Sequence, residues 1–384
     1  MTWSHIGFGF STRSLAELVA IAQDPPRPLW CLPKRPSVRR ERNHALRRAD
    51  LEEGRIVIKS NVARVSILVT LLLSVATSAS AQEKVHTVDF YSPAVERTMK
   101  YNIVLPEGYE ASTAEYPVLY LLHGLTSNYT AWSRMGTALY AGLAGDLIIV
   151  MPDAGNSWYV NWADNDQGQR NDWEDHIVQD VIGHVDENYR TTERREGRAI
   201  SGLSMGGYGG LTMGLRHPEL FVSIGSTSGA LSYARSSAAR ARGKIPARRV
   251  QERTPEEQAE RAARLARPNP RIGIDGFSSQ TERSPAAQAF ATPADADAYD
   301  PYKLVLQVPH EDLPHIYLDS GTEDGLIRDA RAFAQILFEN DIPFDFMQMP
   351  GRHNGDYWVQ SLGHIVSIQY EVMRRALGER PVRN

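Results

Sequence analysis

The stretch GRAISGLSMGGYGGLTMGLRHP, residues 197–218, decides the fold. Residues 197–201 are typical of a short buried strand, and residues 208–215 are typical of a helix that ends before the proline. Between them, Gly-x-Ser-x-Gly around Ser204 predicts a sharp, strained turn, in which Gly202 and Gly206 avoid the crowding that a Cβ would cause. A chance match in a Gly/Ser-rich turn is the alternative, but the strand-turn-helix context favours a serine held above the edge of a sheet.

Apolar runs alternate with helical stretches along most of the chain. Residues 85–91 and 99–105 predict an antiparallel opening pair of strands, which ends at Pro106-Glu107-Gly108. Further strands are expected at residues 117–122, 147–151, 221–225, 316–318 and 344–347, and helices at 173–189, 205–215, 327–339 and 357–377. Continuous apolar runs separated by helices indicate a mostly parallel central sheet with helices on both faces, so the fold class is α/β.

Residues 61–81 read as a secretory signal peptide. Lys59 and Arg64 form a basic flank, residues 65–75 are apolar, and Ala79-Ser80-Ala81 is a small-x-small site, so cleavage is expected after Ala81. The apolar run is shorter than the roughly 20 residues that a spanning helix needs, which favours export over a membrane anchor. The Arg/Lys-rich residues 1–60 are expected to be upstream translation or a disordered extension, and residues 82–384 the catalytic domain.

The expected mature domain is acidic and has no thiol. The whole chain has 384 residues, 42% of them hydrophobic, which is enough for one large α/β domain with extra segments. Residues 1–81 hold 12 Lys/Arg, 6 Asp/Glu and the single cysteine, Cys31, so the rest has 30 basic and 40 acidic residues and a formal charge of −10. This charge argues against nucleic acid and anionic membranes as partners, and the absence of cysteine from residues 82–384 excludes disulfides there.

Candidate partners for Ser204 follow two late strands. A serine nucleophile needs a base to take its proton and an acid to orient that base. Three carboxylates, Asp319, Glu323 and Asp324, lie at or after the strand expected at 316–318, and His353 lies in a Pro/Gly loop after the last strand. The order serine, acid, histidine is that of the α/β-hydrolases. The sequence therefore predicts Ser204 as nucleophile and His353 as base, with three candidates for the acid.

An oxyanion hole requires two backbone N–H groups beside the serine. One is expected from Met205 and the other from Leu125, in the loop after the strand expected at 117–122, where Gly124 lets the backbone approach closely. His123 in the same loop is a rival base. It precedes Ser204 in the wrong order, however, and is expected to hold the loop in place.

Five stretches of the sequence together resemble the esterase D-like branch of the α/β-hydrolases over about residues 85–378. These stretches are LLHGLTSNYTAW (121–132), MPDAGNSWYVNW (151–162), SGLSMGGYGGLTMGLRHPELF (201–221), DSGTEDGLI (319–327) and PGRHNGDYW (350–358). The branch includes secreted short-chain and feruloyl esterases, S-formylglutathione hydrolases and mycolyltransferases. The resemblance implies the triad Ser204, Asp324 and His353; it favours Asp324 because the family acid follows a Gly-Thr-Glu-like step. It also places Leu125 and Met205 at the oxyanion hole.

The chain departs from the family pattern at two places. Arg352 stands where the family usually has glycine before the histidine. The Arg- and Ala-rich insertion at about residues 234–296 is longer and more basic than expected; it includes a helix that begins at Thr254 and runs to about residue 266. Its position between late strands predicts a lid-like role. Its basic stripe, Arg261, Arg264 and Arg267, is read as a solvated helix face rather than a site for an anionic substrate.

Two further clusters have open interpretations. Trp158 and Tyr159 either line the substrate pocket, as the resemblance suggests, or pack in the core. The acidic segment of residues 164–166 together with Asp172 offers oxygen ligands for calcium, but its spacing matches no complete loop motif, so a solvated loop is favoured and no metal is predicted.

The function expected from the sequence is an exported serine carboxylesterase that needs no cofactor. It hydrolyses short-chain or aryl, feruloyl-type esters, and its substrate is a small or saccharide-linked ester. The alternatives are a thioesterase of the S-formylglutathione hydrolase type, against which the signal peptide argues, and an acyltransferase of the mycolyltransferase type. The least favoured alternative is a catalytically inactive binding protein on the same fold. The sequence leaves the oligomeric state open.

Overall fold

An eight-stranded sheet forms the centre of the computed structural model, which describes residues 85–163, 168, 170–244 and 289–378. The described residues lie in the second of two compact units of the chain, the one that begins at Leu71. The expected extension, the signal peptide, the helix beginning at Thr254 and the acidic residues 164–166 lie outside the described residues.

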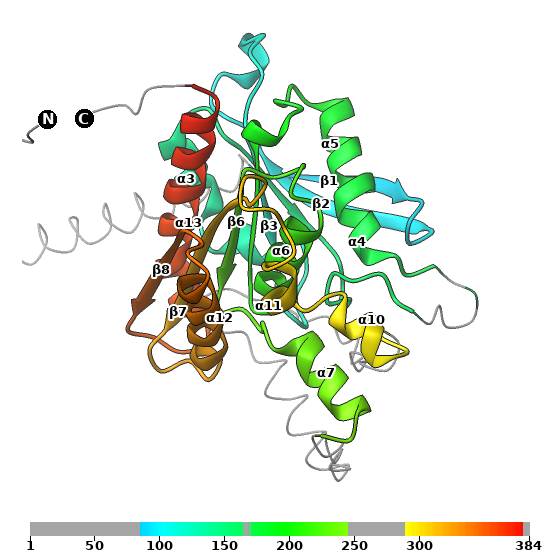
Figure 1. The fold of residues 1–384 in the computed structure, drawn as a ribbon. Helices are drawn as coiled ribbons and strands as arrows, with labels where there is room; N and C mark the ends of the chain where they lie inside the picture. Colours follow the sequence, from blue (N-terminus) through cyan, green and yellow to red (C-terminus); the bar gives the residue numbers. More distant parts are fainter. Residues whose placement is uncertain (1–84, 164–167, 169, 245–288, 379–384) are drawn as a thin grey trace, which may run out of the picture. The chain divides into compact units, whose positions relative to one another are not determined.

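The strand order is β1-β2-β4-β3-β5-β6-β7-β8, with β1 and β2 at one edge of the sheet and β7 and β8 at the other (Figure 1). The antiparallel pairs are β1 with β2 and β2 with β4, and all other neighbours are parallel. The strands are β1 (Val85–Ser92), β2 (Arg97–Val104), β3 (Val118–Leu122), β4 (Ile148–Pro152), β5 (Arg198–Leu203), β6 (Ser223–Thr227), β7 (His315–Gly321) and β8 (Phe344–Met349). The predicted α/β fold class and mostly parallel sheet are therefore confirmed.

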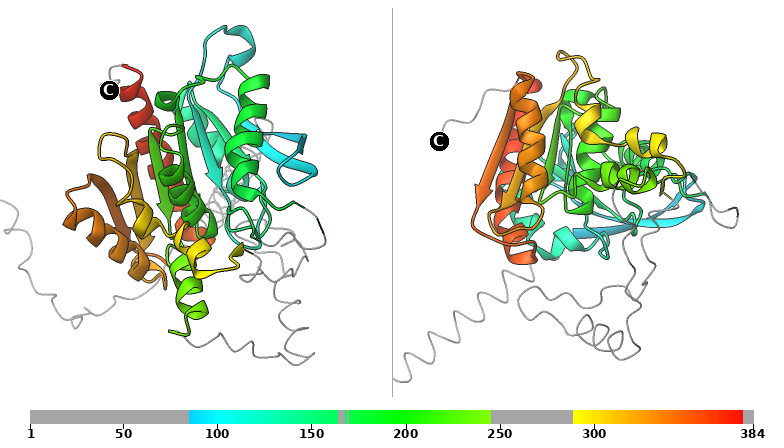
Figure 2. Two further views of the ribbon diagram at one scale, coloured as in Figure 1. Left: turned by 45° about the vertical axis from the view of Figure 1, so that its right-hand side comes forward. Right: turned by 60° about the horizontal axis from the view of Figure 1, so that its bottom comes forward.

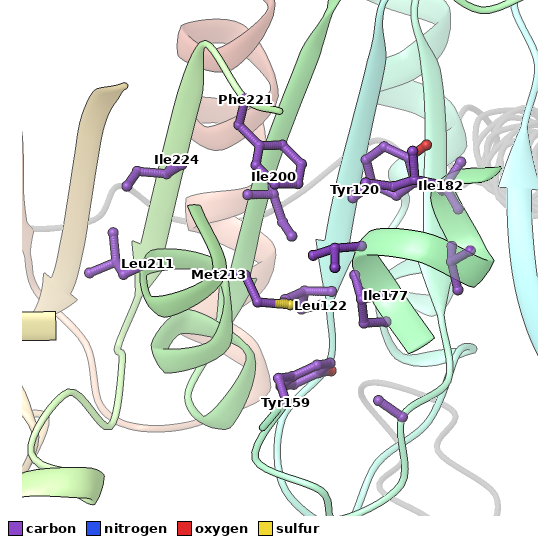
Figure 3. Packing of buried hydrophobic residues seen from close by; sticks show 14 of the residues in the cluster. Tyr120, Leu122, Tyr159, Ile177, Ile182, Ile200, Leu211, Met213, Phe221 and Ile224 are labelled. Carbon is purple, nitrogen blue, oxygen red and sulfur yellow. The ribbon is translucent and has the colours of Figure 1, made fainter. Parts of the chain in front are cut away.

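Each central strand is buried on both faces, which explains its continuous apolar sequence. Every residue of β3, β4, β5 and β6 is buried. Alternate residues of a strand point to opposite faces, so Tyr120 and Leu122 of β3 join one core cluster while Leu119 and Leu121 join the other. Figure 3 shows part of the first cluster, with Tyr120 and Leu122 beside side chains from the neighbouring strands and helices.

Helices cover both faces of the sheet, as predicted. The first cluster includes side chains of α6 (Met205–Arg216), α12 (Ile327–Glu339) and the segment 173–188. The second cluster includes side chains of α3 (Thr137–Ala144) and α13 (Gly355–Ala376). The segment expected to be a helix at 173–189 is helical almost throughout, but it is not a single α-helix. A π-helical segment, His176–Val181, separates α4 (Trp173–Asp175) from α5 (Ile182–Asn188).

Several short helices were not expected from the sequence, because they are too short to show a helical period. They are α2 (Ala131–Arg134), α3, α7 (Tyr233–Ala241), α10 (Pro293–Asp297) and α11 (Pro301–Leu304), with 3₁₀ turns at Tyr109–Ala111 and Arg195–Gly197. The helices α7 and α10, at the two described ends of the predicted insertion, pack against each other (Figures 1 and 2). None of the helices in the described part of the chain is both long and apolar enough to cross a bilayer.

Candidate active site

Ser204 occupies a strained turn between β5 and α6. Its φ is 54° and its ψ is −112°, a conformation that residues with a side chain rarely adopt. The flanking glycines permit this turn: a Cβ on Gly202 would lie 2.8 Å from the Leu122 Cβ, and a Cβ on Gly206 would lie 2.7 Å from the His123 carbonyl oxygen. The Ser204 N–H donates to the Thr227 carbonyl oxygen at 2.9 Å, which fixes the turn to the end of β6.

The structure brings the three residues favoured for the triad together. The His353 Nε2 lies 2.9 Å from the Ser204 Oγ, and the His353 Nδ1 lies 2.9 Å from the Asp324 Oδ2. A carboxylate can only accept, so Nδ1 carries the proton toward Asp324 and Nε2 is free to accept the Ser204 proton. This is the arrangement in which a histidine can act as a general base toward a serine.

Asp324 is suited to orient a histidine because it is buried and ionised. Burial alone would raise the pKa of Asp324, but hydrogen bonds from His353 and from the Leu326 N–H lower it below its ordinary value. Asp324 is 3% exposed. The negative charge therefore persists at neutral pH, where it holds the imidazole in the required tautomer.

The acid and base loops, after β7 and β8, are bonded directly to each other. The Thr322 N–H donates to the Met349 carbonyl oxygen and the Glu323 N–H to the Gly351 carbonyl oxygen, at 2.8 and 3.0 Å. In return the Gly351 N–H donates to the Glu323 carboxylate at 2.6 Å. Sequence reasoning placed Glu323 among the candidate acids, but in the structure its carboxylate accepts a hydrogen bond from the backbone of the histidine loop.

Asp319 makes a different set of contacts from Asp324. It is fully buried, and its carboxylate accepts hydrogen bonds from Thr227, Tyr357 and Ser361. The His353 Nδ1 is bonded to Asp324 instead. Of the three carboxylates that the sequence left open, Asp324 is thus the one positioned to orient the base.

The loop after β3 lies directly beside Ser204. A Cβ on Gly124 would lie 3.4 Å from the Ser204 Cβ, and Leu125 is the next residue. Met205 is the first residue of α6, so its N–H has no partner within the helix. Both expected oxyanion donors are therefore on the two segments that adjoin the serine.

His123 holds the loop after β3, as predicted. It is buried; its Nδ1 lies 2.8 Å from the Gly124 carbonyl oxygen, and its Nε2 accepts from the Ala154 N–H at 3.0 Å. Both ring nitrogens are thus used in structural hydrogen bonds. The Tyr159 hydroxyl donates to the His123 carbonyl oxygen at 3.0 Å and supports the same loop.

Trp158 and Tyr159, the two aromatic residues expected at the pocket or in the core, lie in different environments. Tyr159 is fully buried against Gly209 of α6, so it belongs to the core that supports the site. Trp158 is partly exposed and stacks in parallel on Tyr233, with ring centroids 3.6 Å apart. Since Tyr233 begins α7, this stack connects the pocket residue expected from the sequence to the start of the insertion.

A second set of serine, histidine and aspartate, which sequence reasoning missed, lies at the other end of the strands. The His315 Nδ1 is 2.9 Å from the Ser223 Oγ, and its Nε2 is 2.9 Å from the Asp345 Oδ2. Ser223 begins β6, His315 begins β7 and Asp345 lies near the start of β8. Ser204, in contrast, follows the carboxyl end of β5. Ser223 is fully buried within a strand, so it is inaccessible to a substrate carbonyl.

No group of three or more His, Cys, Asp or Glu side chains that could hold a metal ion occurs among residues 85–163, 170–244 and 289–378. Asp172, which was considered as a calcium ligand, pairs with Arg170 at 2.7 Å.

The strand order and the elbow at Ser204 define an α/β-hydrolase fold. A family model described as "Putative esterase" matches residues 92–367, and the chain belongs to this family. Feruloyl esterases, S-formylglutathione hydrolases and mycolyltransferases are among the proteins similar to the chain, which confirms the resemblance to the esterase D-like branch.

Several curated proteins are similar to part of the chain, including the following two. Esterase Rv1288 of Mycobacterium tuberculosis is 36% identical over 150 residues, which cover 38% of this chain and 32% of that protein. The endo-1,4-beta-xylanase/feruloyl esterase of Xylanibacter ruminicola is 30% identical over 156 residues, which cover 38% of this chain and 21% of that protein. The matches thus span a third or less of these relatives.

A solved structure shares the fold over almost its whole length. The fluorophosphonate-binding serine hydrolase F of Staphylococcus aureus superposes with a TM-score of 0.54 and 22% identity, over 74% of this chain and 98% of that chain. At this identity the similarity shows the shared fold.

Proposed function

We propose that this protein is a serine carboxylesterase, with Ser204 as nucleophile, His353 as general base and Asp324 as the acid that orients the base. The observation that carries the proposal is the continuous hydrogen-bonded chain from the Ser204 Oγ through both nitrogens of His353 to Asp324. The strained backbone at Ser204 supports it, because strain of this kind is found where a side chain must be held in one functional position.

In the proposed mechanism, the Ser204 Oγ attacks the ester carbonyl carbon while its proton passes to the His353 Nε2. The carbonyl oxygen becomes an oxyanion, which the N–H groups of Leu125 and Met205 stabilise. His353 then gives its proton to the alcohol oxygen as the carbon–oxygen bond breaks, which leaves an acyl-enzyme. Water repeats the sequence: His353 takes its proton, the oxygen attacks the acyl carbon, and Ser204 departs with the proton.

For the substrate, we propose short-chain or aryl esters of the feruloyl type, carried on a small alcohol or a saccharide. Two observations support an aryl acyl group: the partly exposed Trp158 ring stacked on Tyr233, and the feruloyl esterase in the name of one relative. Aromatic rings bind flat aryl groups through stacking and burial. The described ends of the insertion pack around the same rings, which supports a lid-like role for residues 234–296.

The export of the protein is a second part of the proposal. Residues 61–81 act as the signal peptide, the catalytic domain begins at Gln82, and residues 1–60 are upstream sequence or an extension. Export also distinguishes the esterase from a cytosolic S-formylglutathione hydrolase. N-terminal sequencing of the natural protein tests this part. A mature N-terminus at Gln82 supports it, and a peptide from residues 1–50 in the natural product contradicts the interpretation of those residues as upstream translation.

A panel of substrates tests the activity. p-Nitrophenyl esters from acetate to palmitate, methyl ferulate, an acetylated sugar and S-formylglutathione are each offered to the purified protein. Preferential hydrolysis of short or aryl esters supports the proposal, and preferential turnover of the thioester supports the alternative hydrolase. An acyltransferase is recognised by acyl transfer to an added sugar in place of hydrolysis. A protein that turns over none of these compounds would favour an inactive binding protein.

A further inference from the structure

Asp319 is a buried carboxylate, five residues before Asp324, that the proposed mechanism does not use. It lies near the end of β7 and has no exposed surface. Its Oδ1 accepts a hydrogen bond from the Tyr357 hydroxyl at 2.9 Å. Its Oδ2 accepts from the Thr227 and Ser361 hydroxyls at 2.9 and 2.6 Å. Asp319 therefore joins three elements, β6, β7 and α13, through one side chain.

The contact with Thr227 leads to the nucleophile. Thr227 is the last residue of β6, and its carbonyl oxygen accepts the Ser204 N–H at 2.9 Å. The Asp319 carbonyl oxygen in turn accepts the N–H of Ser228, the next residue, at 2.8 Å. Asp319 thus holds the end of β6 by both its side chain and its backbone, and this strand end fixes the turn that carries Ser204.

The contact with Tyr357 leads to the base. The Tyr357 N–H donates to the Asn354 side chain, which caps α13 directly after His353. The Tyr357 ring also packs against Gly351, where an added Cβ would lie 3.3 Å from the Tyr357 Cβ and closer to the ring. A hydroxyl held by Asp319 therefore fixes the ring on which the histidine loop rests.

We propose that Asp319 is a positioning residue for ester hydrolysis, which holds the Ser204 turn and the His353 loop at the separation that proton transfer requires. The inference rests on the proposed function, since it assigns a role toward the same serine and histidine. Asp319 does not touch the substrate or exchange a proton with it; it acts through Thr227 and Tyr357.

The physical chemistry of the site agrees with this role. A buried carboxylate is costly unless its oxygens are hydrogen-bonded. Burial raises the pKa of Asp319 above its ordinary value, while hydrogen bonding by the Ser361, Thr227, Tyr357 and Tyr317 hydroxyls acts in the opposite direction. Because the carboxylate accepts from both β6 and α13, a movement of either element relative to β7 breaks at least one of these hydrogen bonds. The three elements are therefore held in one arrangement, which suits a site that requires fixed distances.

Two variants test the inference with little change in volume. Asp319→Asn replaces one oxygen with a donor, so at least one hydroxyl loses its acceptor. Tyr357→Phe removes the hydroxyl and keeps the ring against Gly351. Because a misplacement of about 1 Å can cost on the order of a hundredfold in rate, we expect each variant to lose about tenfold in kcat for p-nitrophenyl acetate, with KM within about twofold. The rate of Ser204 labelling by a fluorophosphonate falls by a similar factor.

The double variant distinguishes positioning from two unrelated losses. If Asp319 acts on the histidine loop through Tyr357, the kcat of the double variant is little lower than that of the worse single variant, because the two substitutions break the same connection. The matched control is Glu174→Gln. Glu174 is also a buried carboxylate with three partners, Arg216, His217 and Tyr299, but it lies at the opposite end of α6 from Ser204. We expect Glu174→Gln to lower the Tm and to leave kcat per folded molecule unchanged.

Each result decides the inference. Wild-type kcat and labelling rates in folded Asp319→Asn and Tyr357→Phe would overturn it, as would a loss of kcat in Glu174→Gln equal to theirs. Independent, multiplicative losses in the double variant would also overturn it. If Asp319→Asn fails to fold, Tyr357→Phe alone carries the test. A wild-type protein that is labelled but hydrolyses none of the esters would contradict the proposed function, while the labelling rates would still test Asp319.

Discussion

Gly321 and Gly351 approach so closely that neither the acid loop nor the histidine loop can move separately. A Cβ built on Gly321 would lie 2.6 Å from the carbonyl carbon of Gly351 and closer still to its oxygen. Gly321 ends β7, three residues before Asp324, and Gly351 lies two residues before His353. The backbone contact, together with the hydrogen bonds of Glu323 to Gly351, sets the spacing between the acid and the base.

We expect Gly321→Ala to reduce activity strongly. The new methyl group meets backbone rather than a flexible side chain, so the histidine loop must shift, and a shift of about 1 Å can cost on the order of a hundredfold in kcat. Gly325→Ala is the matched control in the same loop, because nothing lies within 4 Å of an added Cβ there. Steady-state hydrolysis of p-nitrophenyl acetate measures both; equal activities in the two variants would contradict this reading of the contact.

Asp324→Asn is expected to be far more damaging than either Asp319→Asn or Glu323→Gln. An asparagine at 324 presents a donor or a neutral acceptor to the His353 Nδ1 and favours the wrong tautomer, an effect that costs about ten-thousandfold in kcat in a serine protease. Glu323→Gln keeps an oxygen for the Gly351 N–H. The measurement is kcat at equal folded concentration. The acid assignment fails if Asp319→Asn is the most damaging of the three.

Trp158→Ala is expected to change the choice of acyl group more than the chemistry. Acetate requires the triad and the oxyanion donors, whereas an aryl acyl group also gains contact with a ring that Tyr233 holds in place. Loss of such a contact is worth roughly 1–3 kcal/mol, or about 10- to 200-fold in relative kcat/KM. The ratio of kcat/KM for methyl ferulate to that for p-nitrophenyl acetate measures the effect. An unchanged ratio would remove Trp158 from the proposed pocket.

We expect the free energy of unfolding to fall in acid because of His176. It is buried, and burial lowers its pKa from 6.5 to about 4. As the pH falls below about 6.5, the unfolded chain takes up a proton at this residue and the folded protein does not, so stability is lost progressively down to about pH 4 by as much as about 3 kcal/mol. Urea unfolding at pH 7 and pH 4.5 measures this loss for the wild type.

His176→Asn is the control for this pH dependence. The variant loses the hydrogen bonds of His176 to Ser92 and to the Asp153 carbonyl oxygen, so it is less stable at pH 7. It has no imidazole to protonate, however, and its further loss between pH 7 and pH 4.5 should be smaller than that of the wild type. Identical pH dependence in the two proteins would show that His176 does not titrate in this range on unfolding.

The sheet could be predicted from the sequence because its central strands are buried on both faces and so read as continuous apolar runs, such as residues 118–122. The long helices were found from their apolar spacing. The helices α7, α10 and α11 were not found, since short helices hold their place through tertiary contacts. One such contact, from the Tyr208 hydroxyl of α6 to the Tyr299 carbonyl oxygen, fixes the connection between α10 and α11. Local sequence carries little record of such contacts.

Two residues of the triad could be predicted from the sequence around them. Ser204 and His353 each stand in a distinctive local pattern. The acid stands in no such pattern, because Asp319, Glu323 and Asp324 lie within six residues of one another, and the family resemblance alone favoured Asp324. Their roles differ only in the direction of each side chain: Asp324 contacts His353, Glu323 contacts the Gly351 N–H, and Asp319 is bonded to Thr227, Tyr357 and Ser361. The second set of serine, histidine and aspartate, at Ser223, His315 and Asp345, was missed for the same reason: strand pairing brings these residues together, and no local pattern marks them.

Ser204→Ala, measured beside Ser223→Ala, tests the central proposal most directly. Both serines lie 2.9 Å from a histidine nitrogen that is bonded in turn to an aspartate, but only one of them is on the strained turn. We expect a fluorophosphonate probe to label the wild type and Ser223→Ala, and to leave Ser204→Ala unlabelled. Hydrolysis of p-nitrophenyl acetate should fall by up to about a millionfold in Ser204→Ala. If folded Ser204→Ala keeps more than a few per cent of wild-type hydrolysis, or is still labelled, Ser204 is not the nucleophile.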